Sequence, residues 1–177
     1  MEIKNFYLKK KVYDLNDLIQ NSESYIGGFN NEFLVEFIEK NRDEHVENGT
    51  LMIEGSIVFI SNYKEIGNIP IFDDLPSLYS YYLNAIEEYL DNGVATFYYP
   101  SQPIEVILKK DVGRKTKLTI DEDSLVLNEQ VLMEVLINNS KQFFDILLNQ
   151  LKLKNYEHEL NQIEAIKKCL LNKGHSN

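Results

Sequence analysis

Two adjacent carboxylates, Asp73 and Asp74, form the pair of residues in this sequence that is best placed to do chemistry. Paired carboxylates can divide the roles of general acid and general base when their environments separate their pKa values. Asp74 also stands directly before an apolar helical pattern that has Pro76 near its start, where a short carboxylate caps the first turn. Because capping explains Asp74 without catalysis, we expect no catalytic residue here.

Metal-binding patterns are weak along the whole chain. None of the three histidines, His45, His158 and His175, has a second histidine at helical spacing. The acidic triplet that begins at Asp121 resembles a calcium loop only superficially, because Val126 stands where the loop needs glycine. We therefore expect neither a metal ion nor another cofactor.

Nucleophile and nucleotide-binding motifs are absent from the sequence as well. Cys169 is the only cysteine, so an intrachain disulfide and a thiolate metal cluster are both impossible. The sequence has no Gly-x-Ser-x-Gly motif, no Walker-type lysine loop and no dinucleotide fingerprint. These absences favour a protein that is not an enzyme.

The central segment, residues 73–110, contains six of the eleven tyrosines. Tyr81 falls outside the apolar stripe of the predicted helix 75–92, which suits either a binding residue or one half-buried against a neighbouring strand. Tyr98 and Tyr99 must point to opposite faces of a strand, so one of them should be the more exposed. We take Asp73, Asp74 and these three tyrosines as the candidate binding residues.

A basic group stands out against the acidic background: Lys109, Lys110, Arg114, Lys115 and Lys117 lie within a predicted hairpin. Positive side chains at this density could contact an anionic ligand or partner, or could simply be solvated at a hairpin tip. Aromatic residues are not interleaved with them, which disfavours single-stranded nucleic-acid binding. The role of this hairpin stays open at this point.

The formal charge is −10, whereas 44% of the residues are hydrophobic and 11% aromatic. That hydrophobic content argues against disorder, and the acidity argues against a general nucleic-acid binder because phosphates would be repelled. The apolar runs are too short to span a membrane, and no signal-peptide pattern follows Met1. We expect an acidic cytoplasmic protein, and the bias towards lysine, asparagine and isoleucine suggests a bacterial source.

Hydrophobic periodicity predicts an α+β fold: a mainly antiparallel β-sheet of about five to seven strands, a central amphipathic helix and two C-terminal helices packed on it. The helices are expected at 75–92, 128–153 and 156–171, with a short helix or turn at 14–20. The strands are expected at 3–12, 32–39, 50–62, 95–99, 104–110, 115–120 and 125–127, with Gly55 as a possible bulge. At 177 residues the chain suits a single domain, in which residues 128–172 form the C-terminal helical pair.

Packing requirements are greatest for the helix after Asn128, whose apolar side chains cover about 260° of its wheel. It must therefore be covered on more than one side, by the sheet together with the last helix or by a second subunit. Intrachain cover is favoured, because the last helix has an apolar stripe of its own. A monomer and a homodimer both remain open.

Three functional hypotheses follow. The first is a non-catalytic protein-binding module, such as an immunity or inhibitor protein that neutralises a basic bacterial partner. The second is a small enzyme of unknown reaction whose site is assembled only in the fold, from Asp73, Asp74, His45 and Tyr98. The third is a subunit of a homo-oligomer that uses the apolar face around Phe143 and Phe144.

Overall fold

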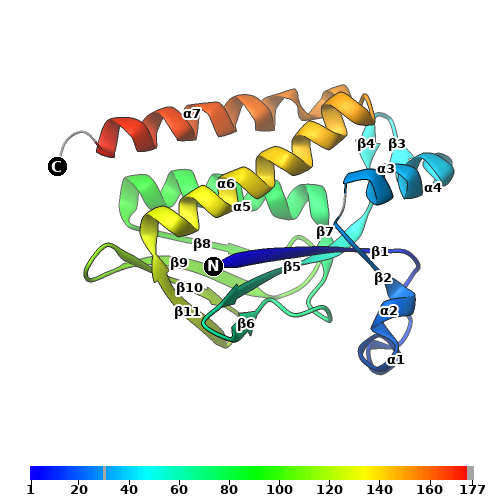
Figure 1. Ribbon diagram of the computed structural model, residues 1–177, viewed down its shortest axis with the longest axis horizontal. Coiled ribbons are helices and arrows are strands. Elements are labelled where there is room, and N and C mark those ends of the chain that lie inside the picture. The colour runs from blue at the N-terminus through cyan, green and yellow to red at the C-terminus, as the bar shows by residue number, and fades with distance from the viewer. Residues whose placement is uncertain (30, 175–177) are drawn as a thin grey trace.

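Two antiparallel sheets lie side by side, and two long helices cover one face of them in the computed structural model (Figure 1), which describes residues 1–29 and 31–174. A third long helix lies over the first two and makes no extensive contact with the sheets. A hydrophobic core joins the sheets and all three helices. Within these described residues, the opposite face of the sheets carries no long helix.

The first sheet has the strand order β2-β1-β5-β6, with β7 paired to β5. Its strands are β1 Glu2–Leu8, β2 Ile26–Gly28, β5 Glu54–Ser61, β6 Lys64–Ile66 and β7 Asp73–Asp74. The tight turn between β5 and β6 has positive φ at both Asn62 and Tyr63. Such a turn matches the twist of a two-stranded hairpin.

The second sheet is a meander in the order β11-β10-β9-β8. Its strands are β8 Val94–Tyr98, β9 Glu105–Asp111, β10 Lys115–Ile120 and β11 Asp123–Asn128. The predicted hairpin around Gly113 is therefore confirmed. The two sheets meet where β6 lies beside β11, and Lys64 forms a salt bridge of 3.6 Å with Asp123 there.

The central helix α5, Leu75–Asn92, has the limits that its capping residues predict. The Asp74 side chain accepts a hydrogen bond from the Ser77 amide, and Gly93 ends the helix with a φ of 75°. Tyr79, Tyr82 and Tyr89 lie in its buried stripe. The Tyr89 hydroxyl reaches the buried Thr116 hydroxyl of β10 at 2.6 Å, which fixes the helix against the second sheet.

The C-terminal helices cover each other. Helix α6, Glu129–Asp145, continues into a π-helical turn, Ile146–Gln150, and α7, Glu157–Gly174, follows after the short 3₁₀ segment Lys154–Tyr156. Phe143 and Phe144 are fully buried within the chain, so the face named for a subunit contact is already covered. Cys169 of α7 is half-buried, and His175 lies outside the described residues.

The remaining elements are short and lie at one end of the molecule. They are α1 Leu15–Gln20, α2 Ser22–Tyr25, α3 Asn31–Lys40, α4 Arg42–His45, β3 Val46–Glu47 and β4 Thr50–Leu51. The strand predicted at 32–39 is wrong, because this segment forms α3. Leu34 and Ile38, four residues apart, are both fully buried, while Phe33 and Glu36 face solvent.

Other predicted strands need smaller corrections. The strand at 3–12 ends at Leu8, and the strand at 50–62 is divided into β4 and β5. Gly55 pairs regularly with Tyr7 and Asp73 rather than forming a bulge. It is glycine because a Cβ atom there would lie 2.1 Å from the Phe6 carbonyl oxygen. The α+β class is confirmed, although the strands form two main sheets and not one.

Candidate functional site

Asp73 is a structural residue in a corner of the fold. It is buried, and its Oδ2 accepts a hydrogen bond of 2.8 Å from the Ser101 amide, while its Oδ1 accepts one of 2.7 Å from the Asp74 amide. Ser101 belongs to the turn between Pro100 and Pro103, so this carboxylate joins that turn to β7. The Gln102 side chain adds a hydrogen bond to the Phe72 carbonyl.

Asp74 and Glu54 face each other across β7 and β5, beside Asp73. Burial, together with the nearby Asp73 and Asp74 carboxylates, raises the pKa of Glu54. Asp74 also keeps the cap of α5, because its Oδ2 lies 3.0 Å from the Ser77 amide nitrogen. The predicted Asp73–Asp74 pair is thus engaged in holding strand, turn and helix together.

The three tyrosines named from the sequence lie in different surroundings. Tyr99 is 3% exposed and Tyr98 is 56% exposed, which confirms that they take opposite faces. The Tyr98 hydroxyl donates a hydrogen bond of 2.8 Å to Glu105. Tyr81 is 39% exposed and packs edge-on against Phe97 of β8. This contact agrees with the interpretation of a tyrosine packed against a neighbouring strand.

These placements separate the five candidate binding residues. Asp73 and Tyr99 are buried in the corner and Asp74 is partly buried beside them. Burial raises the pKa of Tyr99, and the nearby Asp73 carboxylate adds to the rise. Tyr81 lies on the helix-covered side of the second sheet, since its partner ring Phe97 also packs against Tyr82, whereas Tyr98 lies on the open side. The five residues therefore do not form one surface.

His45, named for the enzyme hypothesis, packs its ring against Phe37 at a centroid distance of 4.9 Å. Its Nδ1 lies 3.2 Å from the Met52 carbonyl oxygen, which orients the ring. None of Asp73, Asp74, His45 and Tyr98 lines either of the two hollows described next. No shared cleft therefore brings these four residues together there.

An acidic arm, defined as residues 31–47 of α3, α4 and β3, lies at one end of the molecule. It carries six carboxylates against two cations, Lys40 and Arg42. Arg42 is occupied within the chain, by a salt bridge of 2.5 Å to Glu39 and a hydrogen bond to the Leu151 carbonyl. The arm therefore keeps an excess of negative charge.

Phe33 is the exposed aromatic of this acidic arm, with 62% of its surface accessible. Beside it lies a hollow of about 360 Å³, here named the arm groove. The groove is lined by Tyr7, Lys9, Gly27, Gly28, Phe33, Glu36, Phe37 and Lys40. The Tyr7 ring lies against Gly27, where a Cβ atom would be only 2.2 Å from its Cζ atom, and burial with the nearby Glu36 raises the pKa of Tyr7.

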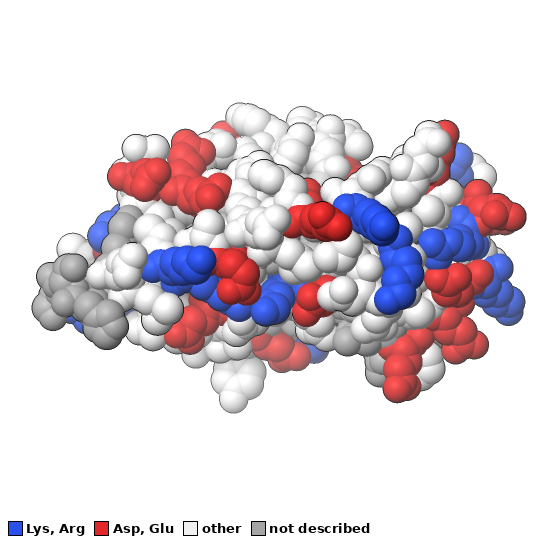
Figure 2. Space-filling view, turned by 90° about the horizontal axis from the view of Figure 1, so that it is seen from above, with Lys and Arg blue, Asp and Glu red and all other residues white. Residues whose placement is uncertain are grey.

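Charges of both signs are interspersed over the helical face of the molecule (Figure 2). Charged side chains crowd at the end that carries α3 and α4. The net charge of −10 therefore does not form one continuous acidic field on this face. Negative charge that could attract a partner is concentrated in local clusters, and the acidic arm is one of these clusters.

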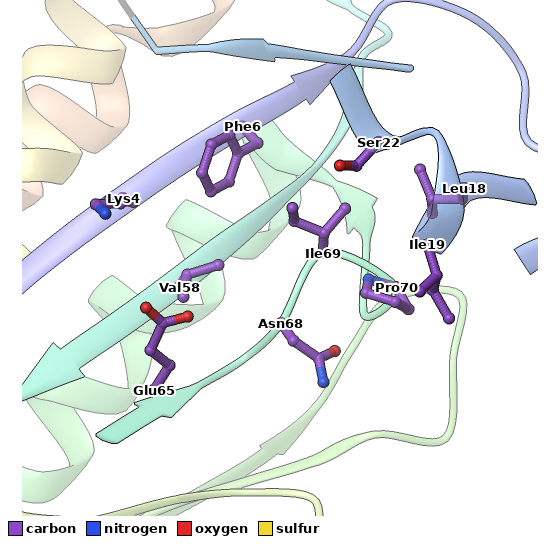
Figure 3. Close-up of a pocket in the computed structure, with 10 residues that line it drawn as sticks. All are labelled: Lys4, Phe6, Leu18, Ile19, Ser22, Val58, Glu65, Asn68, Ile69 and Pro70. Atoms are coloured by element: carbon purple, nitrogen blue, oxygen red, sulfur yellow. The ribbon is translucent and has the colours of Figure 1, made fainter. Parts of the chain in front are cut away.

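A second hollow of about 410 Å³ lies on the other face of β1, and we name it the sheet groove (Figure 3). Phe6 of β1, Val58 of β5 and Ile69 of the loop after β6 surround it. Leu18 and Ile19 of α1 lie at one end, and Lys4 and Glu65 lie at the other. The result is an apolar floor with one charge of each sign.

Sequence reasoning missed both hollows. The arm groove had one local signal, because Leu34 and Ile38 are spaced for a helix and would have placed Phe33 on the outside. The sheet groove had none, since its lining comes from four separate segments that no local pattern connects.

Comparison of the chain with known protein families, curated proteins and solved structures found no match. Within residues 1–29 and 31–174, no group of three or more His, Cys, Asp or Glu side chains is arranged to hold a metal ion. No helix in the same part of the chain is both long and apolar enough to cross a membrane. The surface features of the molecule are therefore what indicates its function.

Proposed function

We propose that this protein is a non-catalytic module that binds a basic protein partner, in the manner of an immunity or inhibitor protein, through its acidic arm and arm groove. The observation that carries the proposal is Phe33, an exposed aromatic at the lip of a groove in an acid-rich segment. Phe33 does not stand alone, because the partly exposed Phe37 lines the same groove, and contiguous apolar surface of this kind marks interaction sites. Aromatic anchors that enter or border pockets dominate the energetics of protein interfaces.

The negative charge of the acidic arm also supports binding of a basic partner. Within the described residues, the exposed carboxylates of Glu36, Asp43, Glu44 and Glu47 form no salt bridge. A basic partner would gain from them in association rate and in orientation, while Phe33 and Phe37 provide apolar contact area. Lys9 and Lys40 at the groove would meet acidic or carbonyl groups of the same partner.

Affinity capture from a lysate of the source organism tests the proposal, with the purified protein immobilised. We expect a basic protein to be retained and to elute as the salt concentration rises. Two variants, Phe33→Ala and Glu36→Lys, should lose it. The matched controls Tyr13→Ala and Glu122→Lys, which change an exposed aromatic and an exposed carboxylate elsewhere, should retain it.

Circular dichroism and melting temperature of each variant exclude misfolding as the cause of a loss. Capture of no basic protein, or equal loss in the arm variants and the controls, contradicts the proposal. Retention by all four variants alike places the contact elsewhere on the molecule and contradicts the role of the arm.

The sheet groove favours a second candidate function, the binding of a small, largely apolar molecule. It is an open hollow of about 410 Å³ rather than an enclosed cavity, and its apolar floor has a few polar groups at the rim, so a bound molecule would stay partly exposed. Heteronuclear NMR with a fragment library tests it. Shifts gathered at Phe6, Val58 and Ile69 support ligand binding, and shifts scattered over the surface oppose it.

A further inference from the structure

The second sheet has an open face, on the side away from α5 and α6. Alternation along β8 shows it: Val94, Thr96 and Tyr98 are exposed, while Ala95 is buried and Phe97 partly so. The same alternation continues in the other strands, where Leu108, Leu118 and Leu127 are buried towards the helices. In the described part of the chain, no helix covers this open face.

One row of side chains crosses this face from edge to edge. The strand register places Val94 beside Lys109, Lys109 beside Lys117, and Lys117 beside Val126. The row spans about 14 Å, because neighbouring strands lie about 4.8 Å apart. Val94 and Val126 are 41% and 50% exposed, so two apolar side chains flank two cations.

The two lysines are unfavourable neighbours within the chain itself. Like charges directly opposite each other in an antiparallel pair destabilise the sheet. Neither lysine forms a salt bridge with a described residue. Lys115, two residues before Lys117 on β10, lies on the same side, but the register places it opposite Asp111, whose carboxylate partly offsets its charge. An external anionic group would relieve this repulsion.

The other residues of the open face limit which kind of anionic group could bind there. The adjacent row is Thr96, Ile107, Thr119 and Ser124, which is uncharged. At the far end, Tyr98 is hydrogen-bonded to Glu105, whose carboxylate would repel any anionic group beyond the cationic row. A ligand with only a few carboxylates between apolar residues therefore fits better than a continuous run of phosphates. The face thus combines a short cationic row with apolar and hydroxyl groups, and it offers no stack of aromatic rings for bases.

We infer that this open face binds an acidic, extended polypeptide segment. Carboxylates of the segment would meet Lys109 and Lys117, and its apolar side chains would lie on Val94, Val126 and Ile107. A cluster of three cations is smaller than the four to eight that anionic membrane surfaces select. This surface shares no residue with the acidic arm, so the inference stands apart from the proposed function.

Fluorescence anisotropy tests the inference with a labelled peptide, Ile-Ser-Glu-Ser-Glu-Ser-Ile, because every second side chain of an extended chain points to the same face. We expect saturable binding that weakens with salt, and about a tenfold loss of affinity in Lys109→Glu. Lys168→Glu is the matched control, because it makes the same charge change on the exposed face of α7. It should bind as the wild type does.

A second measurement separates binding from folding. Lys109→Glu replaces a repulsive pair with an attractive one opposite Lys117, so its melting temperature should equal or exceed that of the wild type. Loss of peptide binding in a stable variant supports the inference. No binding, equal loss in Lys168→Glu, or stronger binding of a single-stranded oligonucleotide or an anionic phosphatidylserine vesicle overturns it. Variants of the acidic arm should leave peptide binding unchanged.

Discussion

The carboxylate of Asp73 accepts a hydrogen bond of 2.8 Å from the backbone amide of Ser101, which lies 28 residues further along the chain. The Asp73 side chain is almost completely buried, although Ser101 itself is exposed, so the bond is partly shielded from water. It fixes the turn between Pro100 and Pro103 against β7 and thereby the connection from β8 to β9. The acidic pair that was considered for acid–base catalysis therefore has a structural role.

Replacing Asp73 by alanine should lower the free energy of unfolding by about 1 to 3 kcal/mol, since two partly buried amide hydrogen bonds lose their carboxylate acceptor. Asp74→Ala should cost about 1 kcal/mol, the usual effect of losing a helix cap. Urea denaturation of the two variants beside the wild type measures both values. Equal and small effects would mean that the Ser101 bond contributes little.

Two buried tyrosines offer a matched comparison of the same atom. The Tyr156 hydroxyl accepts a hydrogen bond of 2.9 Å from the Leu51 amide. The buried Tyr99 hydroxyl, in contrast, has only the neighbouring Tyr82 hydroxyl as a weak partner among the described residues. Tyr156→Phe should therefore cost about 1 to 2 kcal/mol by leaving the amide unsatisfied, while Tyr99→Phe should be neutral or stabilising by about 1 kcal/mol. Thermal or urea unfolding of the pair decides, and a larger loss in Tyr99→Phe contradicts the prediction.

Alkaline conditions should unfold the protein. Burial raises the pKa of Tyr99 from 10.0 to about 12, and burial acts in the same direction on Tyr89 and Tyr156. Below pH 10.0 the tyrosine is neutral in both states, so its contribution to stability is fully present. As the pH rises from there towards about 12, the unfolded chain loses the proton while the folded chain keeps it, and stability falls.

Urea unfolding at about pH 9 and about pH 11 measures this loss. We expect about 1.4 kcal/mol for each such tyrosine over this interval, because the loss begins only near the unfolded pKa of 10.0. Tyr99→Phe is the control, because it removes one of these groups and should lose less stability over the same interval. Stability that does not change between the two pH values contradicts the prediction.

Local signals in the sequence predicted those parts of the fold that local physics decides. Asp74 and Gly93 mark both ends of α5, and the alternation at Tyr98 and Tyr99 predicted that one of them is more exposed than the other. The bond from Asp73 to Ser101 and the sheet groove could not be predicted in this way. Both depend on segments that are distant in sequence, and no spacing within one segment records the contact.

The strand predicted at 32–39 was wrong for a different reason. Its apolar residues occupy both odd and even positions, so Phe33, Val35 and Phe37 suit a strand while Leu34 and Ile38 suit a helix. Periodicity alone cannot choose between two such sets. The core decides, because Leu34 and Ile38 are fully buried when the segment is helical.

Substitution along α3 therefore tests both the helix and the proposed contact site. Leu34→Ala should lower the free energy of unfolding by about 2 to 5 kcal/mol, because it empties a fully buried position. Phe33→Ala should change it by less than about 0.5 kcal/mol, because that ring is mostly solvated. Urea denaturation of the two variants would show the opposite order if the segment were a strand with Phe33 facing the core. With the helical order established, a loss of partner binding in the stable Phe33→Ala variant is assigned to contact and not to folding.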